Sequence, residues 1–134
     1  MPADTYTSLL GTLVMGTGND NNTWGDNANA SVFAILENAI AKRKANTGLT
    51  GGTLDLATTI PPAGASSAIE MIQYFSGTLT SNQIVQPPNL SKVWLVHNAL
   101  TLGGFTLTFK TSGGTASGAI PVGRSLVFCD GAGT

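Results

Sequence analysis

Short apolar segments separated by glycine and proline run through residues 49–134, and this pattern constrains the fold more than any other. Phe105, Leu107 and Phe109 alternate with polar residues, as in a strand with one buried face. Residues 93–97 are apolar on both faces. A series of short strands with regular turn signals is typical of a sandwich or a small barrel. We therefore expect a β-sandwich-like module over residues 49–134.

The expected strands lie between turns rich in glycine, proline and asparagine. Gly-Thr-Leu begins at Gly52 and at Gly77, and Gly-Phe-Thr-Leu begins at Gly104. Because the residues between these motifs do not align, we interpret them as repeated hairpin chemistry. The expected strands are residues 51–56, 69–75, 77–85, 93–97, 105–110 and 126–129, with a turn or linker at 60–64.

The composition argues against a partner that is bound mainly through charge, such as a nucleic acid. Charged residues make up 10% of the chain and the net charge is −1, whereas nucleic-acid binding needs a basic patch. The 18 Thr and 17 Gly are typical of an all-β or fibrous protein. The start of the chain lacks the basic region of a signal peptide, and the apolar stretch 9–15 is too short to span a bilayer. We expect synthesis in a cytoplasm and no membrane insertion.

A helical pattern begins at residue 32, with apolar residues at i, i+3, i+4, i+7 and i+8. We expect this helix to end near residue 44 or 45, with Gly48 just beyond it. Residues 1–48 would then hold an N-terminal arm, an Asn-rich loop and an assembly helix, so that the chain is mainly β with one short helix. The predicted apolar face of this helix consists of Val32, Ile35, Leu36, Ala39 and Ile40.

The polar segment before the helix, residues 18–31, contains five Asn and two Asp around Trp24. An EF-hand register with Gly25 at position six puts Trp24 and Ser31 where oxygen ligands belong, so we expect no metal site. Asn and Ser side chains commonly cap helices, and Asn29 or Ser31 is a plausible cap. Trp24 would then anchor the loop to the body of the protein.

Residue types that carry catalysis are isolated in this sequence. His97 has no paired nucleophile, and Cys129 lies in an apolar strand without a basic neighbour. Residues 42–44 hold half of the basic residues, and we interpret them as cations that complement the helix dipole. The single cysteine excludes an internal disulfide. We therefore expect no catalytic, cofactor or metal residues and no enzyme activity.

Two apolar features predict self-association. The predicted apolar face of the helix must be buried, either on the β part of its own chain or in a short parallel bundle between copies. In residues 93–97, Val93 and Leu95 form one apolar face and Trp94 and Val96 form the other. One of these faces can enter the core, and the other needs a neighbouring surface. We expect Trp24 and the predicted apolar face of the helix to act in assembly.

Residues 18–26 read GNDNNTWGD, and Asn29 and residues 38–41 follow them. The later segments of interest are residues 75–82, 92–98, 105–110 and 127–131. In these segments the chain resembles tail-fibre proteins of tailed bacteriophages. The resemblance implies a structural virion component, usually trimeric, that attaches to the particle and contributes to host adsorption. Because the chain stops after Asp130-Gly131 without shaft repeats, a short fibre, an adaptor and a decoration subunit all remain open.

Three other functions remain as alternatives. A carbohydrate-binding module would expose aromatic residues such as Tyr74 or Trp94 to a glycan or another partner. A capsid decoration protein would bind other virion proteins. A polysaccharide-degrading enzyme would need two carboxylates facing each other in a groove.

Overall fold

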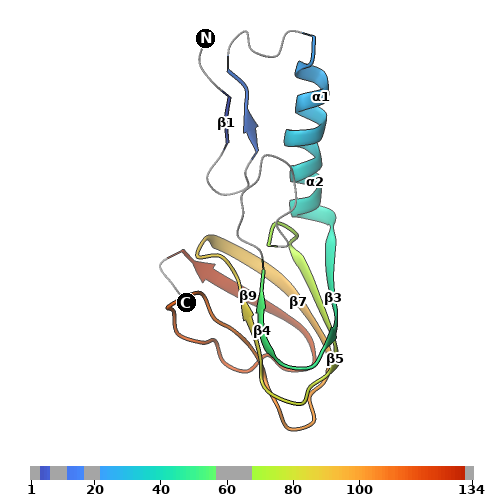
Figure 1. The fold of residues 1–134 in the computed structure, drawn as a ribbon, viewed down its shortest axis with the longest axis vertical. Coiled ribbons are helices and arrows are strands. Elements are labelled where there is room, and N and C mark those ends of the chain that lie inside the picture. Colours follow the sequence, from blue (N-terminus) through green and yellow to red (C-terminus); the bar gives the residue numbers. More distant parts are fainter. Residues whose placement is uncertain (1–3, 7–11, 17–21, 57–67, 132–134) are drawn as a thin grey trace.

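The computed structural model describes residues 4–6, 12–16, 22–56 and 68–131. One helix of 18 residues stands above a β-module built from two sheets, so the expectation of a mainly β chain with one helix is confirmed (Figure 1). The helix runs along the long axis of the molecule, and its start lies at the end far from the module. The predicted turn at 60–64 lies outside the described residues.

The helix is one continuous element in three parts, α1 (Trp24–Ala28), the π-helical η1 (Asn29–Phe33) and α2 (Ala34–Ala41). It begins eight residues earlier than the periodicity predicts, and its first bond runs from the Asn27 amide to the Thr23 carbonyl at 3.0 Å. Asn29 and Ser31 therefore lie inside the helix, and the prediction that either caps it is wrong.

The helix also ends earlier than expected. Lys42 already has an extended backbone, with φ −82° and ψ 143°, and Arg43 begins a strand. The interpretation of residues 42–44 as a basic last helical turn is therefore wrong: no basic residue lies in that turn. The predicted boundary at residue 48 falls inside this first strand of the module.

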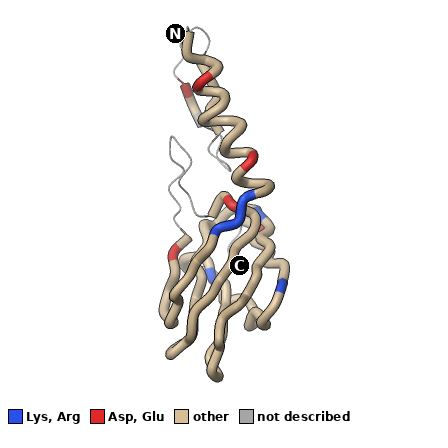
Figure 2. The backbone as a smooth tube through the Cα atoms, turned by 90° about the vertical axis from the view of Figure 1, so that its right-hand side faces the viewer, with Lys and Arg blue, Asp and Glu red and all other residues tan. Residues whose placement is uncertain are grey.

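A short antiparallel ladder, β1 (Thr5–Tyr6) with β2 (Leu13–Val14), represents the N-terminal arm. It lies near the outer part of the helix in the views of Figures 1 and 2. The Gly16 amide donates to Asp4 Oδ1 at 2.7 Å and ties the two segments of the arm together.

The module has a large and a small sheet, and nearly all of its strand pairs are parallel. The large sheet has the order β3-β5-β7-β9, in which only β7 and β9 are antiparallel, and the small sheet has the order β4-β6-β8. The strands are β3 (Arg43–Leu49), β4 (Gly52–Asp55), β5 (Ile72–Thr78), β6 (Gln83–Gln86), β7 (Ser91–Thr101), β8 (Leu107–Phe109) and β9 (Gly123–Asp130).

The chain alternates between the sheets, so that three successive coils (β3–β4, β5–β6 and β7–β8) stack as a parallel solenoid. The interpretation of the glycine motifs as hairpin turns is wrong, because strands that follow each other in sequence lie in different sheets. The motifs are not equivalent positions either. Gly52 pairs with Gln83, whereas Gly77 pairs with Leu49 and Leu100.

One hydrophobic core lies between the sheets. Trp94, Phe75 and Phe109 are its largest members, and the two phenylalanine rings meet edge to face at 5.9 Å. Trp94 Nε1 donates to the Ala68 carbonyl at 3.1 Å, so its one polar atom is satisfied. The other core members are Leu56, Ala68, Leu79, Val85, Val96, Leu100, Leu107, Ile120, Val127 and Cys129.

Buried amide side chains connect the coils. Asn46 donates to Gln73 Oε1 at 3.2 Å, which joins β3 to β5. Gln83 donates to the Gly52 carbonyl at 3.0 Å, which joins β6 to β4. Asn98 donates to the Ile120 carbonyl at 2.9 Å and holds the segment that leads into β9. Because buried amides are costly when unpaired, these bonds help to specify the stacking of the coils.

Candidate assembly surface

One face of the helix packs within its own subunit. Ala28 and Ile35 are 8% and 1% exposed, and Val32 and Ala39 are half-buried on the same side. These four residues follow the spacing i, i+4, i+7 and i+11 of a packed helix face. Of the predicted assembly residues, Val32, Ile35 and Ala39 therefore contact their own chain.

A second face of the helix is apolar and uncovered. Phe33, Leu36 and Ile40 are 62%, 37% and 70% exposed, and we call these three residues the helix stripe from here on. At about 100° per residue, the stripe lies roughly 100° around the helix from the buried face. The predicted assembly residues Leu36 and Ile40 belong to it. Phe33 widens the apolar pattern already in the sequence, but it was not among the predicted assembly residues.

Trp24 does not anchor a loop. It is the first residue of α1 and its side chain is 66% exposed, so the prediction that it anchors a loop to the body of the protein is wrong. Its predicted part in assembly stays a prediction. An indole exposed at the outer end of the helix is available to another surface.

The outer face of the large sheet carries a second apolar surface. One row of this surface crosses β5, β7 and β9 in register and consists of Ile72, Leu95 and Leu126. Two residues away along β7 and β9, Val93 pairs with Phe128 and forms a second row. Leu126 and Phe128 are 70% and 63% exposed. We call these five residues the sheet patch. Of the two apolar faces predicted for residues 93–97, Trp94 and Val96 form the buried one, and Val93 and Leu95 lie on the outer face.

Cations and aromatic rings border the sheet patch. Arg43 lies over the Tyr74 ring at 4.8 Å from its centroid, and Tyr74 contacts His97 edge-on at 5.1 Å. His97 pairs in register with Arg124. His97 and Arg124, together with Ile72, Leu95 and Val96, line a shallow pocket of about 270 Å³. This border is therefore cationic and has a partly apolar floor.

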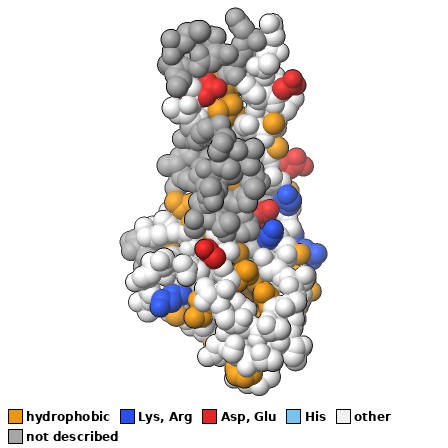
Figure 3. Space-filling model, viewed as in Figure 1, with side chains coloured by type: hydrophobic (Ala, Val, Ile, Leu, Met, Phe, Trp, Pro, Cys, Tyr) orange, Lys and Arg blue, Asp and Glu red, His pale blue; other side chains and the backbone are white. Residues whose placement is uncertain are grey.

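A charged cluster joins the helix to the module (Figures 2 and 3). Lys42 Nζ lies 3.8 Å from Glu70 Oε1, and Lys92 Nζ donates to the Ile69 carbonyl at 2.7 Å. Burial lowers the pKa of Lys92, and the neighbouring Glu70 carboxylate opposes that shift. Because Lys42 directly follows the helix and Glu70 precedes β5, the ion pair helps to fix the base of the helix on the sheet.

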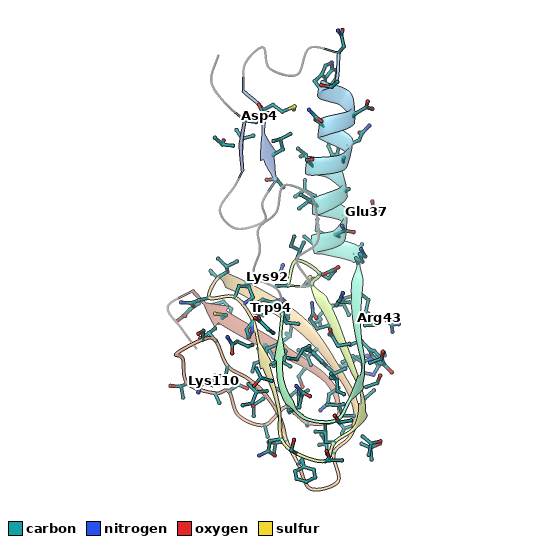
Figure 4. The ribbon with its side chains drawn as sticks, viewed as in Figure 1. Asp4, Glu37, Arg43, Lys92, Trp94 and Lys110 are labelled. Atoms are coloured by element: carbon teal, nitrogen blue, oxygen red, sulfur yellow. The ribbon has the colours of Figure 1, made fainter. Side chains whose placement is uncertain are left out.

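The two aromatic residues predicted to contact a glycan or another partner, Tyr74 and Trp94, differ in exposure. Trp94 is fully buried, so the prediction that it contacts a glycan or partner is wrong (Figure 4). Its alternation with Val93 and Leu95 places it on the core side of β7. Tyr74 is half-buried on the outer face, between Arg43 and His97, and keeps part of its ring accessible.

The described residues bring no catalytic constellation together. Cys129 is buried in the core, and its thiol donates to Asn89 Oδ1 at 3.8 Å. His97 contacts the Tyr74 ring. No group of three or more His, Cys, Asp or Glu side chains that would suit a metal ion occurs in the part of the chain that the structure describes.

Chelation is expected to leave the protein unchanged. The Asn-rich segment fails the EF-hand register, and Asn22 in that segment has φ +71°, a conformation that Asn tolerates without a metal. The melting temperature should be the same with and without excess EDTA. A large drop on chelation would show that the segment binds a metal ion.

Among the described residues, no helix has both the length and the hydropathy needed to cross a membrane. Comparison with protein-family models, with curated proteins and with solved structures finds no match for this chain. The helix stripe and the sheet patch are therefore the features on which a functional proposal depends.

Proposed function

We propose that the protein is a structural component of a bacteriophage virion, a fibre-like or fibre-adaptor subunit that assembles as a homotrimer. The observation that carries the proposal is the pair of exposed apolar surfaces, the helix stripe and the sheet patch. Exposed contiguous apolar surface on a soluble protein marks an interaction site. The resemblance of the segments around Trp24 and Trp94 to phage tail-fibre proteins supports the virion and the trimer.

The physical character of the subunit is consistent with a structural role. A solenoid with buried amide cross-links is a stiff unit, and the helix extends it along one axis (Figure 1). In the trimer, a β-sandwich-like module of two sheets would present its apolar outer face to a neighbouring copy. Attachment to other virion proteins, and a contribution to host adsorption, belong to the same proposal.

Electron microscopy tests the virion role. Antibodies against the purified chain, carrying gold, would be applied to intact particles from cells that produce the protein. We expect gold at one structural position, on the tail or on the capsid. Particles without gold, from a lysate in which the chain is abundant, would contradict the proposal. Gold over the whole capsid would favour the decoration role over the fibre role.

A carbohydrate-binding module remains the second candidate because His97 and Arg124 line a shallow pocket and the Tyr74 ring contacts His97. Aromatic and guanidinium groups are common in glycan sites. A glycan array with the full chain tests this candidate. Binding that is lost in Tyr74→Ala would support it, and the absence of binding to any glycan would exclude it for the glycans on the array.

A further inference from the structure

We propose that the helix stripe of one copy packs on the sheet patch of the next copy. This inference rests on the proposed self-assembly and names the two surfaces that meet. The contact is heterologous, because each copy gives its helix to one neighbour and its sheet to another. Such contacts form a closed ring when the rotation between copies closes, and three copies close one at 120° each.

The two surfaces match in size. From Phe33 to Ile40 the helix rises about 10 Å, at 1.5 Å per residue. Ile72, Leu95 and Leu126 lie on three adjacent strands, which spans about 10 Å at 4.8 Å between strands. The second row, Val93 and Phe128, adds about 7 Å along the strands, so the patch accommodates two turns of a helix.

The charges are complementary. Residues 1–41 contain four acidic residues and no Lys or Arg, and two of the four, Asp26 and Glu37, lie on the helix. Arg43 lies at one end of the apolar row and Arg124 lies two residues from Leu126 at the other end. Glu37, Arg43 and Arg124 form no ion pair within the described residues. An acidic helix therefore meets an apolar patch bordered by arginines.

One acidic residue also lies on the outer face of the sheet. Asp130 follows Phe128 at the end of β9, where it would face an approaching helix. Asp130 already interacts within its own subunit. Arg43 and Arg124 together carry two positive charges against the one negative charge of Asp130, so the border of the patch keeps a net positive charge.

A parallel bundle of the three helices fits less well. The buried face of the helix is already used within the subunit. The helix stripe covers one heptad, and the equivalent positions one heptad earlier are Asn29 and Asp26. A three-fold bundle would place three Asp26 carboxylates near its axis, where like charges repel.

A charge exchange tests the contact in the full-length protein. Glu37→Arg should weaken the trimer at least about tenfold in dissociation constant, because arginine then faces Arg124 and Arg43. Glu37→Arg combined with Arg124→Glu should restore much of that loss. The matched control combines Glu37→Arg with Lys110→Glu, since Lys110 is exposed and lies on the opposite side of the module from Arg43 (Figure 4). This control should show no rescue.

Mixing two defective chains gives a second readout. Leu36→Asp damages only the helix stripe and Leu126→Asp only the sheet patch, and both positions are exposed in the subunit. Each variant alone should be monomeric, with an unchanged near-ultraviolet dichroism spectrum. Their mixture should form a one-to-one dimer, because one undamaged helix meets one undamaged sheet.

The outcomes separate the two proposals. A wild-type trimer with neither charge rescue nor a mixed dimer would overturn the helix-on-sheet contact and leave the proposed assembly standing. A wild-type monomer at micromolar concentration would overturn both. Rescue by the Lys110→Glu control would show that net charge, rather than this contact, governs the association.

Discussion

The Gly77→Ala variant is expected to lose about 2–6 kcal/mol of unfolding free energy, since strain at a glycine-only conformation and overpacking each cost about 1–3 kcal/mol. Gly77 has φ +146°, and a Cβ there would collide with the backbone of Leu49 on the adjacent coil. The obstacle is backbone rather than a flexible side chain, so the coils must separate to admit it. Urea unfolding followed by circular dichroism measures the loss.

Gly104→Ala is the matched control. Gly104 also has a positive φ, +96°, but a Cβ there would meet nothing within 4 Å. Its substitution therefore carries only the conformational cost, roughly 1–3 kcal/mol. Equal losses in the two variants would show that close stacking at Gly77 contributes nothing to stability.

Ile35→Asp is expected to detach the helix from the rest of its own subunit and to destabilise the subunit. Ile35 is 1% exposed, and truncation of a buried isoleucine to alanine alone costs about 2–5 kcal/mol. A carboxylate at the same site adds the cost of burying an unpaired charge. The melting temperature should fall sharply, and the near-ultraviolet dichroism should change with it. Sizing chromatography alone would not distinguish this result from a lost interface.

Leu36→Asp, one residue along the helix, is the control for Ile35→Asp. Leu36 is 37% exposed on the helix stripe, so the charge stays in contact with water in the isolated subunit. This variant should keep the melting temperature of a folded subunit and lose assembly. Wild-type stability in Ile35→Asp would contradict the burial of Ile35.

The period-two patterns of the sequence predicted the later strands well. Residues 93–97 and 126–129 lie in β7 and β9, and the alternation in 105–110 places Leu107 and Phe109 in the core. The same alternation in β9 puts Arg124, Leu126 and Phe128 on one face, a signal of the sheet patch that was missed. Such patterns reflect which side of a strand is buried, and that is local information.

The connectivity of the strands was not predictable in the same way. A strand that pairs with a parallel neighbour shows the same half-buried alternation as one in a hairpin. Segment 77–85 was read as one strand, but Leu79 and Thr80 bond across to Thr101 and Thr50 and turn the chain from one sheet to the other. Coils of unequal length then hide the structural repeat, because equivalent residues do not recur at a fixed interval.

The start of the helix was missed for a different reason. Trp24, Gly25, Asp26 and Asn27 have modest or low helix propensity, so the sequence favours a loop there. The structure continues the helix through them because Ala28 is buried and Asp26 in the first turn complements the helix dipole. Tertiary packing outweighs propensity at these positions.

Light scattering of the purified full-length chain at micromolar concentration tests the central claim, self-assembly through exposed apolar surfaces, most directly. We predict a mass about three times the 13.7 kDa of one chain, because the helix stripe and the sheet patch would otherwise remain exposed to water. A single species of 13.7 kDa would contradict the claim.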